Sequence, residues 1–446
     1  MKRPLLALAV ALVAVRLGAW IVNRPAVIAL VVPMMLAVLL LIVLVRSVAD
    51  GAAGPTGFDR LLRWTLGAFV AHLMLGLLVT NLGGVARYLG GDHFTYHELA
   101  KAIANHWADG SQMPHLPAGK EGYYYILAVL YWVFGGYTHS GLVLNAALSA
   151  ALVPIVSDTA RRLFGRESVR YVPQLVVLLP GMFLWTSQLL KEAPIIFLVA
   201  LAANLGARLA ERVTVALLCG FSLTAAVLLT VRGYIGLAVA ASILGALILG
   251  RGSLVRGVAP AGAAAAILAV LVLSVGLGRG GYEATVSTDL GRVNVVRLEQ
   301  ARAGASGFGE DVDVSTPQRA ISFLPIGTIQ FVLGPFPWQI GSLRQLPALP
   351  DVVVWWALLP SLFRGHRAGR PLAGRRILLL ELPALAATLP LALLIGNFGT
   401  VARERTQVIV LVIPLIALGL TQRAARRQEV AGPAGATHRP LAATST

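Results

Sequence analysis

Apolar runs of spanning length recur from one end of this 446-residue chain to the other. An α-helix needs about 20 consecutive apolar residues to cross the hydrocarbon core of a bilayer. With 57% hydrophobic and 13% charged residues, the composition also excludes most classes of soluble protein. We therefore expect an all-α, polytopic transmembrane helical bundle of about twelve spans. The predicted spans are 5–22, 26–46, 62–83, 141–160, 171–189, 193–210, 213–231, 234–250, 258–277, 349–363, 376–396 and 406–421.

The distribution of charge predicts the orientation of these spans. Lysine and arginine gather in alternate connections, whereas most acidic residues fall in the others. Because basic loops stay in the cytoplasm, we predict a cell-membrane protein with cytoplasmic N- and C-termini and an external face that carries the polar chemistry. The net charge of +17 is then a consequence of topology and predicts no nucleic-acid partner. The single cysteine, Cys219, excludes an intrachain disulfide and a cysteine metal cluster.

The same reasoning divides the chain into one membrane domain and a tail. Residues 1–422 form the predicted transmembrane domain, with external loops at 84–140 and 278–348, and residues 423–446 form a predicted disordered cytoplasmic tail. Residues 122–138 would invert every later loop if they crossed the membrane, so we expect an interfacial or re-entrant helix there. The second, apolar half of the other loop is likewise expected to lie on the membrane.

The segment GDHFTYHELAKAIANHW, at 91–107, is the densest in titratable groups. It should form an amphipathic helix that begins at Asp92 and places Tyr96 on its apolar stripe with Ala100, Ile103 and Trp107. Asp92 is either the N-cap, a catalytic carboxylate, or both.

Substrate-binding candidates surround Asp92 on the same helix, namely His93, Tyr96, His97 and Glu98. His93 and His97, four residues apart, could share a divalent metal with Asp92, but two histidines without a fixed third ligand are weak evidence. We assign no metal ligand and leave a divalent metal as an open alternative.

Two lysine–glutamate pairs lie on the predicted external side. Lys120 and Glu121 precede a run of three tyrosines, where the lysine suits the phosphate of a lipid-linked substrate or simply reaches the headgroups. Lys191 and Glu192 lie between two apolar helices and form either part of a binding site or a hydrated turn.

Three arginines reach the same face. Arg232, two residues before Tyr234, lies in a short turn between apolar helices, where a cation needs a partner or a ligand. Arg403 and Arg405 precede the last span; they either clamp a pyrophosphate or pair with Glu404 and lipid headgroups. The convergence of these cations with Asp92 on one face predicts an anionic lipid-phosphate substrate and a hydroxyl acceptor that needs a base.

At these residues the chain resembles the GT-C class of polytopic glycosyltransferases. The elements concerned are GGDHFTYHELA with Asp92, GKEGYYYILAVLYWVFGGY with Lys120, and the helices of NAALSAALVPIVSDTARRLFG and LLPGMFLWTSQLLKEAPIIFLVAL. The class includes glycosyltransferase family 39, the protein O-mannosyltransferases, the aminoarabinose transferases and a bacterial branch that depends on lipid carriers. The resemblance covers residues 80–240. It implies that Asp92 is a general base, or a metal ligand as in some branches, and that Lys120 meets the carrier phosphate.

The chain departs from the class in several places. His93 follows Asp92 where a second acid is usual, no Pro-Pro follows Lys120, and two spans precede the first helix that is similar to the class. These departures leave the metal requirement and the particular sugar open.

The activity implied by the resemblance is that of a polyprenyl-phosphate-sugar-dependent glycosyltransferase (EC 2.4 class). Such an enzyme transfers a sugar, with inversion, from the carrier to a glycan or protein hydroxyl outside the cell, in assembly of envelope glycans or glycoconjugates. Asp92 would deprotonate the acceptor, while Lys120, Arg232 and one of Arg403 or Arg405 would hold the departing phosphate. Two alternatives stay open: an O-antigen or capsule polymerase, and a lipid or solute transporter or flippase. A transporter should carry charged groups near mid-membrane and repeated halves, and the sequence offers few.

Overall fold

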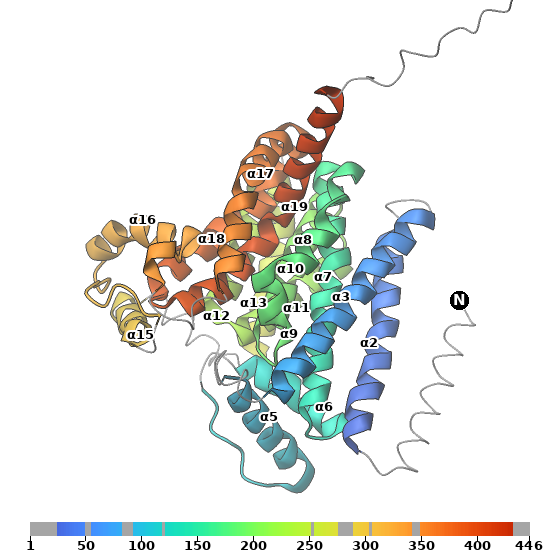
Figure 1. Cartoon of the computed structure of the whole chain (residues 1–446), viewed down its shortest axis with the longest axis vertical. Coiled ribbons are helices and arrows are strands. Elements are labelled where there is room, and N and C mark those ends of the chain that lie inside the picture. Colours follow the sequence, from blue (N-terminus) through green and yellow to red (C-terminus); the bar gives the residue numbers. More distant parts are fainter. Residues whose placement is uncertain are drawn as a thin grey trace, which may run out of the picture.

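The computed structural model describes residues 25–49, 55–82, 92–117, 121–250, 254–274, 289–302, 306–340 and 348–430. Within these ranges the chain is helical and contains no β-strand, only an isolated bridge between Gly307 and Asn397. The all-α prediction is therefore confirmed (Figure 1). The α-helices are α2 (Pro25–Ala49), α3 (Pro55–Asn81), α5 (Asp92–Asp109), α6 (Glu121–Phe134), α7 (Thr138–Phe164), α8 (Val172–Leu178), α9 (Pro180–Ser187), α10 (Glu192–Glu211), α11 (Val215–Val231), α12 (Gly233–Gly250), α13 (Leu254–Ser274), α15 (Leu290–Arg302), α16 (Pro317–Leu333), α17 (Leu349–Ala373), α18 (Leu378–Leu394) and α19 (Phe398–Val430). The 3-10 helices are η1 (Arg166–Val169), η2 (Pro337–Gln339) and η4 (Gly374–Ile377).

The apolar helices identify a multi-pass membrane protein. In the described part of the chain, seven helices are long and apolar enough to cross a bilayer, or up to eight if the bent pair at α8 and α9 forms one span. Each predicted span that falls on described residues coincides with an apolar helix or, at 171–189, with the bent pair α8 and α9. The predicted span 5–22 lies outside the described residues.

Two predicted boundaries can be compared with the helices. The predicted tail at 423–446 begins too early, because α19 continues as a helix to Val430. Residues 122–138 were expected not to cross the membrane, and α6 has only 14 residues, a length of about 21 Å at 1.5 Å per residue. That length is well short of the roughly 30 Å hydrocarbon core, and the interfacial placement of this helix stays a prediction.

Helices α7, α10 and α19 form the packed centre of the bundle. Helix α7 is buried over most of its length and contacts α2, α3 and α10, while α19 packs along α17. The α17–α19 crossing is close because glycines lie on both sides: a Cβ atom on Gly365 would collide with the Leu415 carbonyl, and one on Gly419 with the Ser361 carbonyl. Small residues allow such approach of two helix backbones, as is common in membrane bundles.

Helix α10 connects two polar regions at opposite ends of the bundle. Its first residue, Glu192, forms an ion pair with Arg403, and its last, Glu211, forms one with Arg162. Twenty helical residues separate these pairs by about 30 Å. Helices α5 and α6 lie together at one end of the bundle (Figure 1), and Arg403, the partner of Glu192, also pairs with Asp92 at the start of α5.

The described part of the second predicted external loop docks beside the start of α19. Helices α15 and α16 pack against α18, and the Phe308 amide donates to the Gly396 carbonyl while the Phe398 amide donates to Ser306. Helix α16 exposes Ile321 and Ile329, apolar side chains that a helix lying on a membrane would present to lipid.

Candidate active site

Asp92 lies where the first predicted external loop meets the bundle. It is the first residue of α5, and its Oδ2 accepts a hydrogen bond of 2.9 Å from Arg403 Nη1 near the start of α19. The side chain of Asp92 is 54% exposed and that of Arg403 is 21% exposed. A carboxylate that is both open to solvent and held in orientation by an arginine can accept a proton from a bound hydroxyl.

Arg403 is shared between two carboxylates. Its Nε lies 3.2 Å from Oε1 of Glu192, which is only 1% exposed at the start of α10. Neither Glu192 oxygen has a hydrogen-bond partner among the described residues, so charge compensation from Arg403 matters to this buried acid. Asp92, Arg403 and Glu192 thereby join α5, α19 and α10 in one cluster, which we call the Asp92 cluster.

The connection between α9 and α10 is buried and held by side chains from α7 and α3. The Asn145 amide donates to the carbonyls of Gln188 and Leu190, at 2.6 Å and 2.8 Å, and His72 Nδ1 lies 2.8 Å from Ser187 Oγ. Lys191 and Glu192 at the end of this connection are both buried. The interpretation of these two residues as a hydrated turn is therefore wrong.

Arg232 joins a second cluster at the same end of the bundle. Its guanidinium bonds Glu404, while its Nε donates to the Tyr234 hydroxyl at 2.6 Å. Tyr234 in turn packs against the small apolar core of α15 and α16, which includes Val293 and Phe323. Glu404 is therefore the partner that Arg232 was predicted to need. Through Tyr234 and Arg232, the second predicted loop is connected to Glu404, the neighbour of Arg403.

Arg405 is enclosed by protein. Its side chain is 1% exposed and donates hydrogen bonds to Asp351 of α17, at 2.8 Å, and to the Gly334 carbonyl after α16, at 2.6 Å. Asp351 also accepts from the Gly181 amide at the start of α9. The structure therefore separates Arg403, which is accessible, from Arg405, which ties α9, α16, α17 and α19 together.

Tyrosines from α5 and α6 pack beside the Asp92 cluster. The ring of Tyr96 lies 5.0 Å from that of Tyr123 and 5.3 Å from that of Tyr124. Burial raises the pKa of Tyr96, and the charges of Glu192 and Asp92 raise it further. Burial, and then the charge of Asp92, also raises the pKa of Tyr124. Both phenols thus stay neutral and keep a proton to donate.

The histidines of α5 point in different directions. His93 is buried and makes a tilted ring contact with Phe94, whereas His97 Nδ1 lies 3.0 Å from the Tyr131 hydroxyl of α6. Burial lowers the pKa of His97, so the ring is neutral near pH 7. Glu98 is exposed and lies 4.0 Å from His97.

The described residues offer no group of three histidine, cysteine or acidic side chains that could hold a metal ion. Asp92, His93 and His97 in particular do not converge on a common point as metal ligands would. We therefore assign no step to a metal.

The prediction for Lys120 lies outside the described residues, while Glu121 begins α6. The predicted amphipathic stripe of α5 is confirmed for Tyr96, Ala100 and Ile103, which are buried. Trp107 is instead partly exposed and stacks on Tyr125.

Sequence reasoning missed Asn145, Asp351 and Gln407. Asn145 and Asp351 are buried polar residues within apolar helices, a pattern that signals internal partners even when the partners cannot be named. Gln407 is fully buried one helical turn beyond Arg403, and its amide has no hydrogen-bond partner among the described residues.

Comparison with known proteins gives distant structural similarity. No protein-family model matches the sequence, and no curated protein matches it. The structure is similar to a crystal structure of ArnT from Cupriavidus metallidurans in the apo state, with a TM-score of 0.46, 13% identity, and coverage of 79% of this chain and 63% of that chain. It is also similar to ArnT from the same organism bound to undecaprenyl phosphate, with a TM-score of 0.47, 14% identity, and coverage of 75% of this chain and 57% of that chain. The chain thus spans less than two thirds of either ArnT structure.

Proposed function

We propose that this protein is a membrane glycosyltransferase that moves a sugar from a polyprenyl-phosphate carrier to a hydroxyl acceptor on the external side. One observation carries the proposal: Asp92 begins a helix outside the spans, is open to solvent, and is held by an arginine from the last span. Its place in GGDHFTYHELA is also where the GT-C resemblance expects the general base.

Asp92 would accept the proton of the acceptor hydroxyl as that oxygen attacks the anomeric carbon of the donor. The bond from the sugar to the carrier phosphate breaks in the same step, and the phosphate leaves as an anion. Charge therefore grows on the phosphate in the transition state, where a fixed cation is most effective.

Arg403 is the described cation that fits the phosphate role. It adjoins Asp92 and is partly exposed, whereas Arg405 is sealed against Asp351 and Arg232 is bonded to Glu404. Lys120 is the second phosphate-binding residue that the resemblance favours. A donor phosphate bound to Arg403 would compete with Asp92 for the guanidinium and so free the carboxylate to act as base.

The other predicted substrate-binding residues take indirect or peripheral roles in this proposal. Lys191 and Glu192 are buried, so Glu192 acts by positioning Arg403. Tyr96 is buried against Tyr124, so its neutral phenol would support the Asp92 cluster from within the protein, and the exposed Glu98 would border the acceptor. The predicted loop at 278–348, anchored beside Tyr234, would select the acceptor.

The test is donor consumption by the purified protein in lipid. Polyprenyl-phosphate sugars are supplied to the wild-type protein and to the Asp92→Asn variant, and donor consumption is followed by mass spectrometry. General-base catalysis contributes about 10²–10⁴-fold, so Asp92→Asn should lose that factor and still bind donor. Asp109→Asn, at the exposed end of the same helix, is the matched control and should retain wild-type activity.

Undiminished transfer by Asp92→Asn would falsify the role of Asp92 as base. No consumption of any monosaccharide donor by the wild-type protein would contradict the glycosyltransferase proposal and favour a polymerase or a transporter.

A further inference from the structure

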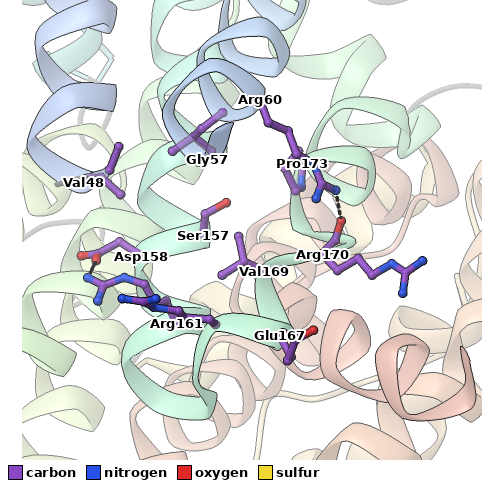
Figure 2. A pocket seen from close by; sticks show the side chains of 13 residues that line it. Val48, Gly57, Arg60, Ser157, Asp158, Arg161, Glu167, Val169, Arg170 and Pro173 are labelled. Carbon is purple, nitrogen blue, oxygen red and sulfur yellow. Dashed lines mark hydrogen bonds and ion pairs between the residues drawn. The ribbon is translucent and has the colours of Figure 1, made fainter. Parts of the chain in front are cut away.

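A basic cavity lies at the end of the bundle opposite the Asp92 cluster. It has a volume of about 400 Å³ and is formed where α2 ends, α3 begins, α7 ends and η1 follows (Figure 2). Four arginines line it, namely Arg60, Arg161, Arg166 and Arg170. The candidate active site uses none of these residues.

The arginines outnumber the acids that face them. Asp158 is fully buried and already accepts hydrogen bonds from Arg161, Arg162 and Arg208. Glu167 is the other acid in the lining. No carboxylate in the described ranges forms an ion pair with Arg60, Arg166 or Arg170, so the cavity carries an excess of positive charge.

The cavity is held open by contacts between its own walls. Arg60 of α3 donates a 2.6 Å hydrogen bond to the Arg170 carbonyl after η1, as Figure 2 shows. Ser168 closes the turn below by donating to the carbonyls of Ala160 and Gly165. These hydrogen bonds fix the backbone segments that carry the arginines.

Ser157 adds a buried hydroxyl to the lining. It is 2% exposed, and its Oγ has no hydrogen-bond partner in the described part of the chain. Figure 2 shows this oxygen directed toward the open centre of the cavity. A buried hydroxyl without a partner is costly, and a ligand oxygen in the cavity would satisfy it.

The remaining wall is apolar, with Val48, Leu61, Val169 and Pro173 beside the cations. A free inorganic anion has no apolar surface to pack against such a wall, whereas a phospholipid places its phosphate next to glycerol and acyl carbons. Basic pockets between transmembrane helices on the cytoplasmic side are suited to anionic lipid headgroups.

We propose that this cavity binds the phosphodiester headgroup of an anionic glycerophospholipid, on the side of the membrane that the charge distribution assigns to the cytoplasm. Arg60, Arg166 and Arg170 attract the headgroup, and Ser157 donates to a headgroup oxygen. Scattered basic residues at this end would follow from membrane topology alone. The hollow between the helices, the apolar wall and the inward hydroxyl do not follow from topology.

The test is native mass spectrometry of the full-length protein in detergent, titrated with short-chain phosphatidylglycerol or with phosphatidylcholine of the same acyl length. The wild-type protein should retain phosphatidylglycerol preferentially. A basic residue at the membrane surface contributes roughly fivefold to binding, so Arg166→Gln should lose that factor. Arg212→Gln removes an exposed arginine at the same end, outside the cavity, and should bind as the wild type does.

Ser157→Ala separates ligand binding from folding. Because the hydroxyl has no protein partner among the described residues, its removal should leave the apparent Tm unchanged or higher while weakening phosphatidylglycerol binding. Equal retention of the two lipids, or equal effects of Arg166→Gln and Arg212→Gln, would overturn the proposal. Displacement of phosphatidylglycerol by millimolar inorganic phosphate would overturn the assignment to a lipid and indicate a free-anion site.

Discussion

Loss of the Arg403 side chain should destabilise the protein far more than loss of the Asp92 charge, although the two residues are bonded to each other. Arg403 also compensates Glu192, which is 1% exposed, at 3.2 Å. At an effective dielectric constant near 20, two unit charges at that distance attract by about 5 kcal/mol. Removal of one partner from a buried pair costs about 3–5 kcal/mol, because the other charge stays buried. Arg403→Gln should therefore lose about 3–5 kcal/mol of stability.

Asp92→Asn should cost less than about 1 kcal/mol, because ion pairs with an exposed partner contribute about 0.2–1 kcal/mol and the Asp92 side chain is 54% exposed. The double variant Arg403→Gln with Glu192→Gln should recover most of the loss, since no buried charge is left without compensation. Arg319→Gln breaks an exposed pair with Asp313 and serves as the control, with little expected effect.

The measurement is denaturant-induced unfolding of the purified protein in detergent, with helix content and tryptophan fluorescence as two probes. The expected order of destabilisation is Arg403→Gln, then the double variant, then Asp92→Asn. The reasoning would be refuted if Asp92→Asn were as damaging as Arg403→Gln, or if Glu192→Gln failed to rescue.

Three other perturbations test separate parts of the structure. Asp351→Asn should lower the free energy of unfolding by about 3–5 kcal/mol, because Arg405 would stay buried without its carboxylate partner. Joint replacement with Arg405→Met should restore stability in the same unfolding measurement, and no rescue would contradict the pairing. Gly365→Ala should cost about 1–3 kcal/mol by forcing the Leu415 carbonyl away, whereas Gly67→Ala meets open space and should be neutral; equal effects would contradict the α17–α19 crossing. Because burial lowers the pKa of His97, the folded protein should lose stability as the pH falls below the ordinary histidine value of about 6.5. His97→Gln should reduce that loss in thermal unfolding curves recorded at several pH values. Identical pH profiles for the two proteins would show that His97 is not desolvated.

Hydropathy predicted the helices well because membrane insertion acts on each segment separately. Residues 193–210 are apolar enough to identify α10 without knowledge of its neighbours, and the aromatic run after Lys120 predicted a helix where α6 lies. The bend between α8 and α9 is less visible, because residues 171–189 read as one apolar stretch. Pro180 at the first position of α9 was its local signal.

The ion pairs of the site could not be predicted because their members are distant in sequence. Asp92 and Arg403 are 311 residues apart, and Arg232 and Glu404 are 172 residues apart. The charge distribution placed all four on one face, but the choice between Arg403 and Arg405 depends on which side of α19 each occupies. That choice depends on Asp351, an acid in an apolar segment whose partner no local pattern reveals.

The two ion pairs at the ends of α10 also set the bilayer thickness that the protein fits. Glu192 and Glu211 are about 30 Å apart along the helix, which equals the hydrocarbon thickness of an average membrane. Because both ends are bonded to other helices, α10 would have to tilt together with them. In a thicker, sterol-rich bilayer one of the two pairs would be drawn into hydrocarbon or the lipid around the protein would have to thin. The protein should therefore partition into, and be most stable in, membranes of ordinary thickness.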